Sequence, residues 1–459
     1  MKKLILTLFI PLLFISCGDN FTDLGPLTQR NVNNFYKNQT DFQLAIRGAL
    51  DGLQSQQTFG VNFMLLMEMR ADNGANGGGA TGLAINLEQL DTFTDLPGNQ
   101  ANEILEATYN KVYNVVASTN NIISRIDGAD FDSEAVRDQI KGEAYFIRSL
   151  LYYHMAVVFG NVPLQLDEVT TTDVDVVQVG ASAIYDQIAT DLVTAEGLLP
   201  ETGRITKWAA AALLGRVQLA NGNPTDAVGP LQRVIASAQY DLVGDYANLW
   251  GPANEGNIET IFEIEYITGN IGEGSSYTDN YTPLGFGGVG GGASPQNTTD
   301  EMLTIYEVGD ERFDATIDTS DPAVNPWVRK FISNPVVQND GGNNWVEIRY
   351  AEVLLNLAEA LGEGGPAYDL IDEVRDRANL GPIDRVGGGT FAEKLLQERR
   401  VEFAFENKRW ADLKRFGVAK SVMAAHLGIP EADVNLLFAI PQGAIDVSPE
   451  SMSQNSEYQ

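Results

Sequence analysis

Residues 141–164 read KGEAYFIRSLLYYHMAVVFGNVPL, and this stretch decides the fold. Its apolar side chains recur every three or four residues, a spacing that predicts an amphipathic helix with one face in a protein core. The residues on that face are Ala144, Ile147, Leu151, His154 and Val158. The phrase Gly160-Asn161-Val162-Pro163 then ends the helix, because glycine and proline both interrupt helical backbone.

The same periodicity recurs on both sides of this helix, between short breaks such as Asn221-Gly222-Asn223-Pro224. Apolar residues at helical spacing predict helices over 41–56, 101–126, 134–158, 181–199, 207–221, 224–238, 347–361, 366–379 and 391–407. The fold class is therefore predicted to be mainly α.

Two of the predicted helix pairs resemble each other when 208–234 is aligned with 348–374. The alignment matches Leu214 with Leu354, Ala227 with Ala367, Leu231 with Ile371 and Val234 with Val374. A small residue where two helices cross, with bulky residues beside it, is the pattern of a tetratricopeptide-like repeat. We expect both pairs to be helix-turn-helix repeats of one scaffold.

Residues 241–346 differ from the rest of the chain. They are rich in Gly, Asn, Asp and aromatic residues, have few helical periods, and contain one predicted strand, over 260–264. Long irregular stretches on a rigid scaffold are usually where binding occurs. We therefore predict a long, irregular, loop-rich insert that carries the ligand site.

Charge and composition exclude several functions. The chain has 30 Lys and Arg against 62 Asp and Glu, and a net charge of −32 repels phosphate backbones, so no nucleic-acid partner is expected. One cysteine and two histidines, His154 and His426, cannot form a structural zinc site or a disulfide framework. We expect no metal and no cofactor.

Two apparent cofactor motifs fail on their context. Gly285–Gly290 fits G-x-G-x-x-G, but Gly-Gly-Ala-Ser-Pro follows where a dinucleotide site needs a helix, which favours a flexible surface loop. Asp72–Gly77 begins like a calcium loop, yet Leu83 stands where an EF-hand needs an acid. An EF-hand is excluded, and an irregular calcium site stays open.

The first residues indicate export. Met1-Lys2-Lys3 is followed by an apolar run over 4–15 that is too short to span a bilayer, which predicts a secretory signal peptide over 1–16. Ser16-Cys17-Gly18 resembles the lipobox of bacterial lipoproteins, which implies that Cys17 carries a lipid; the alternative is a buried, reduced cysteine. Residues 17–40 would then be a lipidated tether.

Four phrases follow one another along the chain: KGEAYFIRSLLYYHMAVVFGNVPL at 141–164, GRITKWAAAALLGRVQLANG at 203–222, IRYAEVLLNLAEA at 348–360 and ERRVEFAFENKRWADLKRF at 398–416. They resemble, in the right order, the phrases of one family, the SusD/RagB outer-membrane lipoproteins of Bacteroidetes. The resemblance covers nearly the whole mature chain, and the closing segment departs from the family pattern at Ala444 and Ser448.

The resemblance implies a SusD-like fold with an N-terminal helical part over 41–240, the ligand-binding insert over 241–346, and a C-terminal RagB/SusD helical part over 347–459. It implies a lipid-anchored protein on the extracellular face of the outer membrane, with no catalysis. Such a protein would bind a glycan and deliver it, as a lid, to a SusC-type TonB-dependent transporter. A peptide-binding lid of a TonB-dependent peptide transporter is the alternative, because fold does not determine ligand; a secreted hydrolase ranks third.

A sugar ring presents an apolar C–H face and a rim of hydroxyls, so its site pairs aromatic rings with planar polar groups. Arg70, Asp72 and Asn73 resemble the family segment that enters the ligand site, with helix capping as the alternative. The predicted ligand-binding residues are Arg70, Asp72, Asn73, Tyr277, Tyr281 and Trp327. Because 241–346 holds few basic residues among many acids, a neutral glycan such as a β-glucan is expected.

The charges of the C-terminal phrase could be mistaken for catalytic carboxylates. Scattered glutamates at helical spacing give no defined acid and nucleophile geometry, so we expect ion pairs that interlock helices. The residues concerned are Glu398, Arg399, Arg400, Glu402, Glu406, Lys408 and Arg409.

Overall fold

The computed structural model describes residues 35–76, 84–94, 102–169, 176–283, 296–322, 324–333 and 337–459. The predicted signal peptide, Cys17, most of the tether, the Gly285–Gly290 phrase and Leu83 lie outside these described residues. The expectations for them therefore stay predictions.

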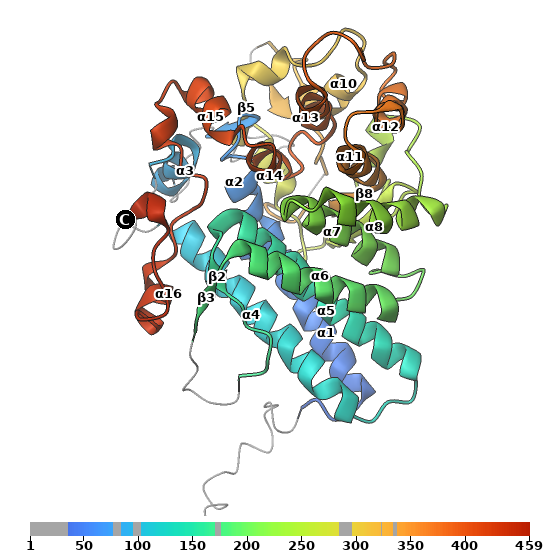
Figure 1. Ribbon diagram of the computed structural model, residues 1–459, viewed down its shortest axis with the longest axis vertical. Coiled ribbons are helices and arrows are strands. Elements are labelled where there is room, and N and C mark those ends of the chain that lie inside the picture. Colours follow the sequence, from blue (N-terminus) through green and yellow to red (C-terminus); the bar gives the residue numbers. More distant parts are fainter. Residues whose placement is uncertain are drawn as a thin grey trace, which may run out of the picture.

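Long helices build the N-terminal part, and Figure 1 shows several of them side by side. They are α1 (Gln39–Gln54), α4 (Glu103–Arg125), α5 (Glu134–Phe159) and α6 (Ala181–Leu198). Ser133 caps α5 by accepting a hydrogen bond from the Val136 N–H, and Gly160 ends it with a φ of 71°. The whole predicted apolar face of α5 is buried, His154 included.

Shorter elements connect these helices. They are α2 (Asn62–Met67), β1 (Gly74–Asn76), α3 (Ala84–Thr92), β2 (Val162–Pro163) and β3 (Gln178–Val179). Turns of 3-10 or π helix lie at Gln56–Gly60, Ile126–Gly128, Tyr246–Leu249, Asp300–Leu303, Glu431–Asp433 and Ser456–Tyr458. Strands β2 and β3 pair antiparallel, so the break after α5 is held beside Gln178.

Two helix pairs pack against each other in the middle of the molecule: α7 (Lys207–Ala220) with α8 (Pro224–Ala236), and α11 (Tyr350–Leu361) with α12 (Gly365–Arg377). Ala227 and Ala367, the small residues of the proposed repeat, are both buried. In α7, a Cβ added to Gly215 would lie 2.5 Å from Leu231 Cγ, so glycine permits the close approach of α8. The two stacked pairs exist, and their tetratricopeptide-like character stays a prediction.

The segment 241–346 contains only short elements among its described residues. They are β4 (Thr260–Ile264), α9 (Tyr277–Tyr281), β5 (Gln296–Thr298), α10 (Arg312–Thr316), β6 (Ile317–Asp318), β7 (Trp327–Val328) and the start of β8 (Trp345–Arg349). The predicted strand over 260–264 is confirmed as β4. The predicted helix over 347–361 is wrong at its start, because 345–349 pairs antiparallel with β4 and the helix begins at Tyr350.

The C-terminal part contains α13 (Phe391–Glu402), α14 (Arg409–Arg415), α15 (Ala419–Leu427) and α16 (Gln442–Val447). The predicted helix over 391–407 is too long. Phe405 and Asn407 have φ values of 66° and 58°, a left-handed backbone that no α-helix continues through. Their N–H groups donate to the buried carboxylate of Glu68 at 2.9 and 3.1 Å. These hydrogen bonds stabilise the end of the helix at this point.

Buried ion pairs join the C-terminal part to the rest, as predicted. The Glu402 carboxylate contacts Arg312 at 3.0 Å and Arg349 at 2.5 Å, and it also pairs with Arg377. Burial alone would raise the pKa of Glu402, but the charges of these arginines hold it well below its usual value. The seven residues predicted to interlock helices are all buried and all paired; they are Glu398, Arg399, Arg400, Glu402, Glu406, Lys408 and Arg409.

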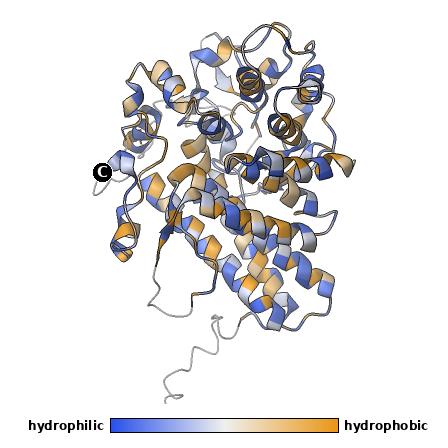
Figure 2. Ribbon diagram, viewed as in Figure 1, coloured by the Kyte–Doolittle hydropathy of each residue, from blue (hydrophilic) through white to orange (hydrophobic). Residues whose placement is uncertain are grey.

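Hydrophobic and hydrophilic residues alternate along the helices in Figure 2, with no long apolar stretch. Among the described residues, no helix has the length and apolar character needed to cross a bilayer.

Candidate ligand-binding site

Two regions far apart in the sequence, the segment after α2 and the insert, meet at one small sheet. Strand β1 pairs antiparallel with β5, with Gly74 opposite Thr298 and Asn76 opposite Gln296. Thr299 continues the contact, because its N–H and hydroxyl donate to the backbone oxygens of Asn73 and Asp72 at 3.1 and 2.9 Å. Strand β5 also contacts β7, which carries Trp327, and α9, which carries the two predicted tyrosines. The structure thus brings the two predicted regions together.

Arg70 lies below this sheet and is fully buried. Its guanidinium carbon is 3.7 Å from the ring centroid of Phe93 and 4.3 Å from that of Phe438, on opposite elements. Nη1 donates to the Leu90 backbone oxygen at 3.0 Å. Arg70 therefore joins α3 to the C-terminal segment from inside the protein.

Asp72 is buried and ion-paired. Its two carboxylate oxygens accept from Nε and Nη2 of Arg409 at 2.7 and 2.8 Å, and Nη2 of Arg400 lies 2.9 Å from Oδ2. Burial by itself would raise the pKa of Asp72, but the hydrogen bond and charge of Arg409 and the charge of Arg400 lower it below its usual value. Asp72 is therefore an anion that connects the β1 segment to α13 and α14.

Asn73 extends the same network. Its Nδ2 donates to Glu68 at 3.1 Å, and its Oδ1 accepts from Nε of Arg400 at 2.9 Å. Glu68 is fully buried, and desolvation raises its pKa to about 7. The side chains of Asp72 and Asn73 thus bind other side chains, and neither forms the helix cap that was the alternative.

The predicted aromatic residues also lie inside. Tyr277 stacks on Trp345 with ring centroids 4.7 Å apart and donates its hydroxyl to the Phe59 backbone oxygen. Tyr281 packs against Phe331 and Phe405, and burial raises the pKa of both tyrosines well above the usual value.

Neither tyrosine has exposed surface, and Trp327 is only 9% exposed. In this structure no ring face of Tyr277 or Tyr281 is open to a sugar. Ligand contact by the six predicted residues stays a prediction, and all six are buried in this structure.

The polar edge of the β1–β5 sheet is what reaches the surface. Asn76 and Thr298 are half-buried on one face of the sheet, whereas Asn297, which lies opposite Ala75, is half-buried on the other face. The Asn76 side chain donates to Glu88 at 3.0 Å, and its backbone N–H donates to Asp91 at 3.0 Å. Amide, hydroxyl and carboxylate groups side by side suit hydrogen bonding to sugar hydroxyls.

Beside this edge, the exposed carboxylate of Glu301 accepts from Arg400 at 3.1 Å and contacts Nδ1 of His426 at 3.0 Å. The sequence reasoning missed Asn76, Asn297, Glu301 and His426. The polar phrases Gly74-Ala75-Asn76 and Gln296-Asn297-Thr298 were a usable signal, because alternating side chains of a strand reach the same surface. Among the described residues, no group of three or more His, Cys, Asp or Glu side chains is placed to hold a metal ion.

Two family models match this chain. The model described as the SusD family matches residues 314–458, and the one described as "Starch-binding associating with outer membrane" matches 83–219. The SusD-like protein P2 of Formosa agariphila is 28% identical over 501 residues, which cover 96% of both chains.

Solved structures agree with these matches. A laminarin-binding SusD-like protein has a TM-score of 0.79 at 25% identity and covers 92% of this chain and 100% of its own. Surface glycan-binding protein A of Bacteroides thetaiotaomicron, solved with laminarihexaose, has a TM-score of 0.77 at 23% identity, covering 91% of this chain and 100% of its own, and shows the same fold. Because family models match residues 83–219 and 314–458, and SusD-like proteins align with more than nine tenths of the chain, the chain belongs to the SusD/RagB family.

Proposed function

We propose that this protein is a cell-surface lipoprotein that binds a neutral glycan, such as a β-glucan, at the β1–β5 edge. The observation that carries the proposal is the meeting of the β1 segment and the insert at one polar sheet edge. The 25% identical laminarin-binding SusD-like protein, whose structure this chain resembles along 92% of its length, supports a β-glucan as ligand.

The charge of the chain supports a neutral ligand. The cations nearest to the sheet edge are already paired: Arg409 with Asp72, and Arg400 with both Asp72 and Glu301. A uronate or sulfated glycan would be repelled by the remaining carboxylates of Glu88 and Asp91, which lie beside Asn76. Hydroxyl groups can both donate to such carboxylates and accept from amides.

In the same proposal Cys17 carries the lipid anchor, and the protein delivers its glycan to a SusC-type TonB-dependent transporter as a lid, without catalysis. The description of the model that matches 83–219 supports an association with the outer membrane. The leader sequence supports the anchor.

Calorimetric titration of the mature chain tests the ligand class. We expect binding of laminarihexaose and no binding of uronate oligosaccharides of equal length. Asn76→Ala at the edge should weaken laminarihexaose binding by about fivefold or more, since a lost hydrogen bond contributes about 1 kcal/mol. The matched control is Asn114→Ala, an exposed asparagine on α4.

Trp327→Ala tests the aromatic prediction. Circular dichroism must first show that the variant is folded, because Trp327 is nearly buried. Tight uronate binding, or binding of peptides in place of glucans, would contradict the proposal; the second result would favour the peptide transporter alternative.

A further inference from the structure

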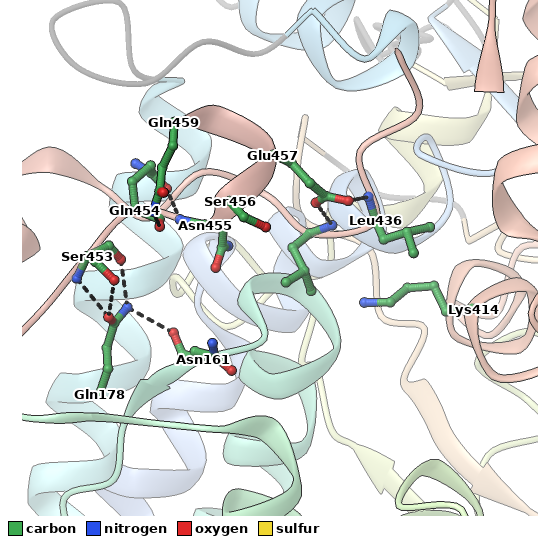
Figure 3. A pocket seen from close by; sticks show the side chains of 11 residues that line it. Asn161, Gln178, Lys414, Leu436, Ser453, Gln454, Asn455, Ser456, Glu457 and Gln459 are labelled. Atoms are coloured by element: carbon green, nitrogen blue, oxygen red, sulfur yellow. Dashed lines mark hydrogen bonds between the residues drawn. The ribbon is translucent and has the colours of Figure 1, made fainter. Parts of the chain in front are cut away.

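A cavity lies at the C-terminal segment and shares no lining residue with the β1–β5 edge. Its volume is about 490 Å³, within the range of small-ligand sites. Figure 3 shows the side chains that surround it, which come from the ends of α5 and α14, from β3 and from the last residues of the chain. We call it the tail cavity, lined by Asn161, Gln178, Lys414, Leu436, Leu437, Ser453, Gln454, Asn455, Ser456, Glu457 and Gln459.

Hydrogen bonds within the protein hold the walls of the tail cavity in place. Gln178 donates to the backbone oxygens of Asn161 and Ser453 at 3.1 Å each and accepts from the Ser453 N–H at 2.8 Å. Asn455 donates to the backbone oxygens of Phe159 and Phe438 at 3.0 and 2.7 Å. These bonds hold the closing segment, which departs from the family pattern at Ser448, against the end of α5 and β3. The cavity is therefore preformed.

Other polar groups in the tail cavity have hydrogen-bonding capacity left. Among the described residues, the carboxamide of Asn161 and the hydroxyl of Ser456 have no hydrogen-bond partner. Lys414 uses one of its N–H donors, to the Val157 backbone oxygen at 2.5 Å. Figure 3 shows these three side chains around one space. They offer both donors and acceptors to a ligand.

The charges of the tail cavity favour an uncharged ligand. Among the described residues, Lys414 and Glu457 have the only ionisable side chains that line it. Both oxygens of Glu457 already accept hydrogen bonds, from the N–H groups of Leu436 and Leu437 at 3.0 and 3.1 Å. Burial lowers the pKa of Lys414 to about 7, so this amine attracts an anion only weakly at neutral pH.

The wall of the tail cavity also has an apolar part, formed by Leu436 and Leu437. A ligand with hydroxyl groups on its rim and C–H groups on its faces matches amide, hydroxyl and amine groups beside leucine side chains. We propose that the tail cavity is a second subsite, which binds a short neutral oligosaccharide through Asn161, Ser456 and Lys414. This inference rests on the proposed function, since it assumes that the protein handles neutral glycans.

Calorimetry with laminarihexaose tests the subsite on the full mature chain. We expect two molecules bound per chain, and we expect Asn161→Ala to weaken one of the two binding events by about tenfold while the other stays unchanged. Asn161→Ala removes no hydrogen bond within the protein, so it should fold normally. Asn114→Ala is the matched control.

Lys414→Met should weaken the same binding event, with Lys420→Met on α15 as its control. Hydrogen exchange locates the event independently: laminarihexaose should slow exchange of the amides of 453–459 in the wild type and not in Asn161→Ala.

One binding event that is lost in Asn76→Ala and unchanged in Asn161→Ala would overturn the tail subsite and leave the proposed function intact. Failure of the wild type to bind any glycan would overturn the proposed function and the subsite with it.

Discussion

Replacing Asp72 by asparagine removes one negative charge from the interior without changing the shape of the side chain. Asp72 is 1% exposed and accepts two hydrogen bonds from Arg409, while Arg400 lies 2.9 Å away. The variant leaves two buried guanidinium groups with an uncharged partner. We therefore expect Asp72→Asn to destabilise the whole fold rather than only a binding site.

The magnitude follows from the burial of the pair. Removing one partner of a buried ion pair typically costs about 3–5 kcal/mol, because the remaining charge stays desolvated. Arg400 keeps its contact with Glu301 at 3.1 Å, and the asparagine oxygen can still accept one hydrogen bond. These two effects place the expected loss near the lower end, at about 3 kcal/mol.

Urea unfolding at pH 7 measures this loss, with exposed Asp132→Asn as the control. The control should stay within about 0.5 kcal/mol of the wild type. Because the pairing is buried, 1 M salt should leave most of the difference in place, whereas an exposed pair would be screened.

The pH dependence has a defined sign. The pKa of Asp72 in the folded state lies below its ordinary value of 3.8. Its stabilising contribution is therefore present above pH 3.8 and is lost as the pH falls through the folded-state pKa. The stability difference between wild type and Asp72→Asn should be constant from pH 5 to 7 and should narrow below about pH 4.

Equal stability of Asp72→Asn and wild type at pH 7 would refute this reasoning, since the carboxylate would then not be paired with Arg409. A fully stable variant that had lost glycan binding would instead assign Asp72 to the ligand, as the sequence suggested.

The remaining predictions concern the helix pairs and the leader. Gly215→Ala should destabilise the protein by about 1–3 kcal/mol, because the new Cβ would lie 2.5 Å from Leu231. Gly197→Ala, whose Cβ would have nothing within 4 Å, should instead stabilise the protein by about 0.5–1 kcal/mol. Urea unfolding of both variants tests whether the close approach of α8 to α7 requires glycine at Gly215. Ala227→Trp should lower thermal stability or cause aggregation, at a cost of about 1–3 kcal/mol or more, because the site is fully buried; an unchanged melting temperature would contradict the proposed helix crossing. Cys17→Ala should release the protein from the membrane fraction, and a variant still found there and accessible to protease on whole cells would show that Cys17 is not the anchor.

Most helices could be predicted from the sequence, because their burial pattern repeats at the period of the backbone. The predicted 134–158 and 181–199 differ from α5 and α6 by one residue at an end. The predicted helix boundaries are wrong where contacts with residues distant in the sequence determine the local structure. Residues 347–349 form a strand because β4 lies beside them, and the helix of 391–407 ends early because Glu68, more than 300 residues away, accepts the freed N–H groups.

The candidate site divides in the same way. Composition and resemblance indicated which two segments matter, and the structure joins them at β1 and β5. Sequence could not tell that Asp72 is paired inside or that Tyr277 is stacked on Trp345, since an aspartate or a tyrosine in a loop suits a ligand and a core equally well.

By itself, the sequence determined the helical class, the family and the residues that carry charge, because hydrophobic periodicity and family phrases involve only residues that are close together in the sequence. Only the tertiary structure decided which charges meet and which side chains remain exposed. Arg400 contacts Asp72 and Glu301 because two distant segments converge on it, and the tail cavity exists because 453–459 returns to the end of α5. The physical reason is that desolvation and ion pairing depend on all neighbours in space, and most of those neighbours are remote in sequence.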